Sequence, residues 1–105
     1  MAERTKVFRV LLRAEIKAEL EQDFERTWLE IGSTVTDHPA NLGQWLMRSE
    51  EEDGLYFIVS DWVDEPQFRQ FESSDQHLEH RKRLHPFRSG GAMWTTTVLH
   101  ALEKR

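Results

Sequence analysis

Apolar and polar side chains follow two different periods in the first third of the chain. Between residues 7 and 14 they alternate, as in a β-strand with two unlike faces. One face carries Phe8, Val10, Leu12 and Ala14, and the other carries Val7, Arg9, Leu11 and Arg13. Apolar residues then recur every three or four positions, at Leu20, Phe24, Trp28, Ile31 and Val35. This period predicts an amphipathic helix that ends near Gly32.

The middle and end of the chain add two strands, a helix and a last strand. Leu42–Arg48 and Leu55–Trp62 are predicted strands, and the acidic turn Glu50–Gly54 between them predicts a hairpin. Asp64, with Pro66 and Gln67 after it, has the pattern of a helix start. Ser73 and Gln76 repeat that spacing, so we expect the helix to break, restart and end at Pro86. After a loop over residues 86–91, the last strand is predicted over Met93–Leu102.

The resulting order of strand, helix, strand, strand, helix, strand predicts an α+β, ferredoxin-like βαββαβ fold in one domain over residues 1–105. Its four-stranded antiparallel sheet would have helices on one face. The other face is expected to carry large apolar groups such as Leu11, Ile58 and Trp62. An exposed patch of this kind usually finds a partner, so the sequence predicts a homodimer.

Composition and charge narrow the class of protein further. The formal net charge of −5 makes nucleic acid a poor expectation as a partner. The chain has no cysteine, which fits a reducing compartment and excludes thiolate metal sites. There is no apolar run of signal-peptide or membrane-span length, so a cytoplasmic location without membrane contact is expected. Ser89-Gly90-Gly91 precedes a strand rather than a helix and is no nucleotide loop.

The tract Ser60–Phe68, followed by Phe71 and residues 73–77, joins an apolar strand ending on a tryptophan to a helix with its own start signals. This junction resembles that of the antibiotic biosynthesis monooxygenase (ABM) family. The resemblance implies a dimeric α+β barrel in which Trp62 points into a ligand cavity. It also implies a monooxygenase that needs no metal, flavin or haem, because an aromatic polyketide-type substrate supplies the electrons.

Trp62 could contribute a flat wall for an aromatic ligand and an indole N–H donor. Tyr56 and Ser60 share its strand parity, and Arg13 could stabilise an enolate; we therefore expect Trp62 and Arg13 to be catalytic and Tyr56 and Ser60 to bind substrate. Leu55, Phe57 and Val59 form the more uniformly apolar set that helices would cover. The chain departs from the anthrone oxygenases of the family, which carry an asparagine where Ile58 stands four residues before Trp62.

The predicted second helix carries histidines and a basic run, residues 80–88. His77 and Arg81 lie four residues apart, on one helix face, and are expected to reach the cavity mouth and bind substrate. The basic run could be a solvated surface, or could receive an acidic ligand, an acidic carrier protein or the partner's acidic turn. His77 and His80 could present two imidazoles to a metal, although no third ligand falls at a suitable spacing.

The haem-degrading branch of the same superfamily matches this helix poorly. Phe71 and Arg81 stand where its tryptophan and axial histidine are expected, and His80 is one residue out of phase. One residue turns a helical side chain by about 100°. Two functions from different classes stay open: a cofactor-independent monooxygenase, and a non-catalytic dimeric barrel that binds a small aromatic molecule.

Overall fold

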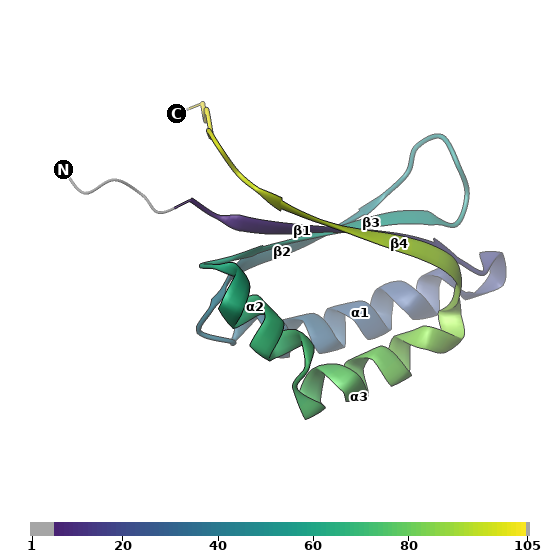
Figure 1. Cartoon of the computed structure of the whole chain (residues 1–105). Helices are drawn as coiled ribbons and strands as arrows, with labels where there is room; N and C mark the ends of the chain where they lie inside the picture. Colours follow the sequence, from purple (N-terminus) through teal and green to yellow (C-terminus); the bar gives the residue numbers. More distant parts are fainter. Residues whose placement is uncertain (1–5, 105) are drawn as a thin grey trace.

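The computed structural model describes residues 6–104 as one sheet with its helices on a single face (Figure 1). The strands are β1 (Phe8–Ile16), β2 (Asn41–Arg48), β3 (Leu55–Trp62) and β4 (Arg88–Thr97). The α-helices are α1 (Glu21–Thr36), α2 (Glu65–Glu72) and α3 (Asp75–Leu84). Short 3₁₀ turns, η1 (Ala18–Leu20) and η2 (His85–Phe87), precede α1 and β4.

The sheet has the order β2-β3-β1-β4, and all its neighbours are antiparallel. The two central strands come from the two halves of the chain, which is the split βαβ arrangement of a ferredoxin-like fold. Figure 1 shows α1, α2 and α3 together beneath the sheet, with the opposite face uncovered. The predicted fold class and element order are confirmed.

Local signals placed several boundaries correctly. The Asp64 side chain accepts the Gln67 backbone N–H at 2.9 Å and its side-chain amide at 3.1 Å, which is the predicted helix cap. The helix breaks and restarts as expected, but the cap of α3 is Ser74, whose Oγ accepts the His77 N–H at 3.2 Å. Ser73, the expected cap, instead donates its hydroxyl back to the Arg69 carbonyl.

The predicted end of α1 and both predicted ends of β4 were wrong because long-range contacts decided them. Helix α1 continues past Gly32 to Thr36, and the Gln44 side chain donates to the Gly32 carbonyl at 2.8 Å. A Cβ on Gly32 would lie 3.1 Å from Gln44 Nε2, so this glycine allows the helix close to β2 rather than ending it. Strand β4 begins at Arg88 rather than at 93, because its glycine pair joins the ladder opposite Glu15 and Ala14. It ends at Thr97 rather than at 102, opposite Phe8, where β1 begins.

The face of the sheet that meets the helices was also predicted incorrectly. Phe8, Val10, Tyr56 and Trp62 are buried against the helices. Ile58 shares this face, so of the residues expected on the open face only Leu11 lies there. Phe57 and Val59, expected under the helices, belong to the open face with Leu55. No helix among residues 6–104 has the length and apolar character needed to cross a membrane.

Candidate functional site

A cavity of about 1010 Å³ lies between the sheet and the helices. This volume is at the upper end of the range of roughly 300–1,000 Å³ that holds small-molecule ligands. Its floor is the inner face of the sheet, where Leu12, Ile58 and Ser60 are half-buried, and α1 contributes Trp28 and Ile31. Helix α3 forms the opposite wall, and exposed residues of α3 and β4, including Leu78 and Met93, mark the mouth.

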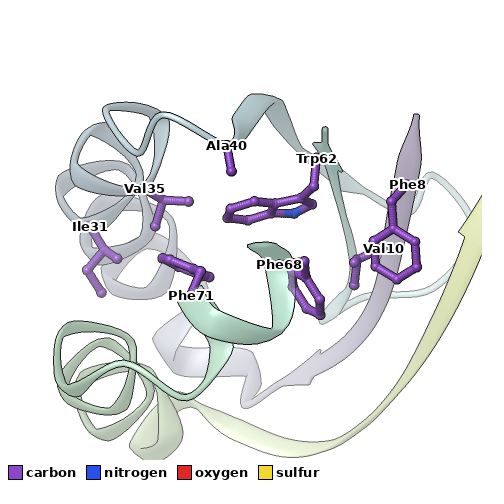
Figure 2. Packing of buried hydrophobic residues seen from close by; sticks show 8 residues of the cluster. All are labelled: Phe8, Val10, Ile31, Val35, Ala40, Trp62, Phe68 and Phe71. Carbon is purple, nitrogen blue, oxygen red and sulfur yellow. The ribbon is translucent and has the colours of Figure 1, made fainter. Parts of the chain in front are cut away.

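Trp62 is mainly a core residue at the edge of this cavity. Only 1% of its surface is exposed, although it borders the cavity. Figure 2 shows Phe68 and Phe71 from α2 on one side of its indole ring, at centroid distances of 5.3 and 4.7 Å. The expectation that Trp62 avoids the helix-facing core is therefore wrong: the cavity and the core lie on the same side of the sheet.

The indole N–H of Trp62 is already used inside the protein. It donates to Ser60 Oγ at 3.0 Å. Because Ser60 Oγ is the acceptor in this bond, its hydroxyl hydrogen remains available to donate. Ser60 is half-buried along the cavity floor. A hydroxyl that accepts one hydrogen bond is polarised toward donating another. Ser60 rather than Trp62 is thus placed to donate to a ligand oxygen, and Trp62 orients it.

Two histidines of α3 line the cavity. His77 packs on Phe71 with a centroid distance of 4.7 Å, which links it through that ring to Trp62. The Nδ1 atoms of His77 and His80 are buried without a hydrogen-bond partner. Burial lowers the pKa of both imidazoles from the usual 6.5, and the nearby Arg81 lowers that of His77 further. Both are therefore neutral at pH 7 and able to accept a proton.

The basic run of residues 80–88 is divided between the cavity and the outer surface. Arg83 pairs with Glu30 at 2.7 Å and does not line the cavity, and Lys82 pairs with Glu79 at 3.3 Å. Arg81 and Arg88 both line the cavity, and neither has an ion-pair partner among residues 6–104. The end of the cavity that Arg81 and Arg88 line, which we call the cationic end, therefore carries a positive charge.

Two residues expected in the site lie outside the cavity. Arg13 belongs to the open face of the sheet, in register with Phe57 and Ala92, where its guanidinium is 3.6 Å from Glu15. Its expected approach to Trp62 is wrong, because neighbouring residues of β1 point to opposite faces. Tyr56 is on the helix side but fully buried, and its hydroxyl donates to Glu25 with Glu21 beside it. Burial and the bond to Glu25 raise the pKa of Tyr56, so it stays protonated.

Three cavity residues were not singled out as site residues from the sequence. Trp28 offers an aromatic surface from α1, His80 was interpreted as out of phase, and Arg88 was assigned to a loop. For two of them, His80 and Trp28, the sequence contains a pattern that could have placed them on the cavity side of a helix. His77, His80 and Leu84 recur at the spacing of one helix face, and Trp28 belongs to the apolar stripe of α1.

Other chemistry has less support in this region. Asn41 is the only asparagine of the chain and pairs in register with Trp62, but it does not line the cavity. Its amide donates to the carbonyls of Asp61 and Gly43 at 3.3 and 3.4 Å. It therefore does not replace the asparagine absent at Ile58. Among residues 6–104, no cluster of three or more histidine or carboxylate side chains could hold a metal ion.

Comparison with known proteins gives the same architecture. The family model described as "Antibiotic biosynthesis monooxygenase" matches residues 7–83. The cofactor-independent oxygenase SnoaB from Streptomyces nogalater has a TM-score of 0.80 at 19% identity, over 95% of this chain and 99% of that one. A conserved protein from Methanosarcina mazei Go1 has a TM-score of 0.81 at 16% identity, over 89% and 93%. No curated protein matches the chain by sequence. At these identities the structural likeness shows the fold alone.

Proposed function

Because this chain belongs to the antibiotic biosynthesis monooxygenase family, we propose that it is a cofactor-independent monooxygenase acting on an aromatic polyketide-type substrate. The observation that carries the proposal is the cavity of about 1010 Å³, which combines an apolar floor with two neutral histidines. Trp28, Ile58 and Leu12 provide the surface for a planar ring system. SnoaB, which has the same fold, is described as a cofactor-independent oxygenase.

The proposed reaction begins with the loss of a proton from an activated substrate carbon. In our assignment, His77 accepts this proton and the Ser60 hydroxyl donates to the enolate oxygen that forms. The carbanion then gives its electrons to dioxygen and forms a carbon–peroxide bond. Loss of water from the peroxide leaves a carbonyl, so one oxygen atom enters the product, the other leaves as water, and the substrate supplies both electrons. No external reductant is required.

A first test uses anthrone as the minimal three-ring substrate. We expect the protein alone to accelerate anthraquinone formation and oxygen uptake in air. Replacing His77 by Gln should lower the rate by roughly 10²–10⁴-fold, the usual contribution of a general base. The matched control is His100→Gln, since His100 is exposed and lies outside the cavity. Binding of anthrone without oxidation would instead favour the non-catalytic aromatic-binding barrel, and a lack of both would contradict the proposal.

The same assay should depend on pH in a defined direction. The groups around His77 are Glu72 from α2 and Asp75, His80 and Arg81 from α3. Since the pKa of His77 is lowered in the folded protein, its basic form persists below pH 6.5 and is lost only as pH falls through the lowered value. We expect kcat/KM to have an acid limb below pH 6.5 that is absent in His77→Gln. Circular dichroism at each pH separates this limb from acid unfolding, to which the same shift contributes.

Haem degradation is a second candidate function, favoured by the position of His80 on the cavity wall. Its imidazole is neutral, and because its Nδ1 is buried without a protein partner, an axial bond would have to form through Nε2. The cofactor-independent proposal predicts no stoichiometric Soret band in the purified protein, and none after dialysis of a haem-treated sample. A retained band that disappears in His80→Ala would move the assignment to haem.

We also propose that the working unit is a homodimer joined through the open face of the sheet. Trp45, Phe57 and Trp94 lie on this face, and between 38% and 52% of the surface of each is exposed. Leu11 and Val59 lie between Trp45 and Trp94 in the same row of the sheet. In a two-fold symmetric dimer the same surface of both subunits forms the interface, so the apolar open face of one subunit can cover that of the other.

A further inference from the structure

Arg88 occupies an unusual place on the inner face of the edge strand. It pairs in register with Ile16, whose side chain is buried under the helices, so Arg88 also points to the helix side of the sheet. A Cβ built on Gly91 would overlap Nη2 of Arg88 and would also lie 2.5 Å from the Arg13 carbonyl oxygen. The arginine therefore lies flat along β4 and over Gly91, within the cavity wall. A side chain at position 91 would therefore displace the guanidinium and clash with the Arg13 carbonyl oxygen.

The Arg88 guanidinium has no carboxylate partner among residues 6–104. Arg88 is half-buried, and no carboxylate among residues 6–104 lies within 4 Å of it or of Arg81. The acidic residues along the cavity are otherwise engaged or distant from this end: Glu72 pairs with Arg69, Glu79 pairs with Lys82, and Asp75 begins α3. A half-buried cation without a partner is unfavourable and selects for a ligand that brings the opposite charge.

The cavity is also long and has unlike ends. Trp62 pairs in register with Phe8 and Gly91 pairs with Ala14, so the two ends are six residue steps apart along β1. At about 3.4 Å per residue this is roughly 20 Å of strand. His77 lies near the Trp62 end, through its contact with Phe71. The proposed reacting carbon and the cationic end are thus at different positions along one ligand.

We propose that the ligand of this cavity carries a carboxylate, held by Arg88 with Arg81 at the mouth, on a chain that extends from its aromatic part. This assignment rests on the proposed function for the aromatic part and adds the acidic group. Arg presents two parallel N–H donors that match the two oxygens of a carboxylate. The half-buried position strengthens the interaction relative to one on an open surface.

The test compares two ligands of nearly equal shape by calorimetric titration: 4-(2-naphthyl)butanoic acid and 4-(2-naphthyl)butan-1-ol. We expect the wild-type protein to bind the acid about tenfold more tightly or better, since a hydrogen bond to a charged group contributes more than one to a neutral group. Arg88→Met should remove this preference and leave the affinity for the alcohol within about twofold. Arg88→Lys should retain part of it, because the charge remains and the two-pronged geometry is lost.

Arg83→Met is the matched control. It removes the same charge from the same segment, but Arg83 pairs with Glu30 outside the cavity, so the preference for the acid should persist. Equal binding of acid and alcohol by the wild type overturns the carboxylate subsite while leaving aromatic binding intact. Equal losses in Arg83→Met and Arg88→Met also overturn it, since they indicate a general charge effect. If neither ligand binds, the proposed function fails with it.

Two further outcomes separate other roles for Arg88. Tighter binding of 4′-phosphopantetheine than of the naphthyl acid would overturn the carboxylate in favour of a phosphate-bearing carrier arm. A change of oligomeric state in Arg88→Met, with the acid preference unchanged, would assign Arg88 to a subunit contact instead. If Arg88→Met does not fold, Arg88→Lys and Arg81→Met carry the comparison, because Arg81 is exposed at the mouth and tolerates truncation.

Discussion

Replacing Trp62 by alanine is expected to lower the free energy of unfolding by about 3–5 kcal/mol, a large part of the stability of a small domain. The ring is 1% exposed and packs against Phe68, Phe71 and His38 at centroid distances of 4.7–5.8 Å. Truncation leaves a cavity among aromatic neighbours that cannot collapse onto a methyl group. Urea unfolding at equal protomer concentration measures the change, since an oligomer's stability depends on concentration.

Two control variants separate the roles of this tryptophan. Leu29→Ala removes an apolar side chain that is 70% exposed, and should change stability by no more than about 0.5 kcal/mol. Trp62→Phe keeps most of the packing but loses the hydrogen bond to Ser60, which we expect to cost about 1–2 kcal/mol. Its oxidation rate should fall together with that of Ser60→Ala, because both changes disturb one donor. Wild-type stability in Trp62→Ala would contradict the core assignment.

Strand β3 shows why the sequence predicted the elements but not their orientation. Its limits, Leu55 and Trp62, were predicted correctly from the apolar run between turn signals. Leu55, Phe57 and Val59 are more uniformly apolar than Tyr56, Ser60 and Trp62, yet the second set faces the helices. If a partner subunit covers the open face, both faces of this strand are buried, and parity cannot tell the helix side from the subunit side.

The candidate site shows a similar division. Ser60, His77 and Arg81 were predicted and do line one cavity, whereas Arg13 was separated from them by the same error of face. The contribution of Arg88 could not be predicted from local pattern. Strand β4 starts at this residue only because Gly90 and Gly91 pair with β1, and glycine has little preference of its own for a strand. Tertiary pairing therefore created the cationic end of the cavity.

A charge placed on the open face of the sheet is expected to convert the proposed dimer into monomers. The wild-type chain has a mass of 12.5 kDa, so a dimer should sediment at 25 kDa, twice that value, at micromolar concentration. Phe57 lies on a central strand of the sheet and is 38% exposed. In Phe57→Glu the two-fold axis would bury two added carboxylates, each at a cost of several kcal/mol, because Arg13 on the neighbouring strand already lies near Glu15. This should weaken association by three or more orders of magnitude, on the order of 4 kcal/mol.

The matched control for this variant is Leu29→Glu, which adds the same charge at an exposed apolar residue of α1, on the helix side of the molecule. It should sediment as the wild type does. Two charged pairs on the open face are already satisfied within one subunit: Arg9 binds Asp61 through two bonds of 2.7 and 2.8 Å, and Arg13 lies near Glu15. They can therefore be covered by a partner without leaving an unpaired charge. A wild type that sediments only at 12.5 kDa would refute the dimer, and a Phe57→Glu protein that stays at 25 kDa would place the contact on another face.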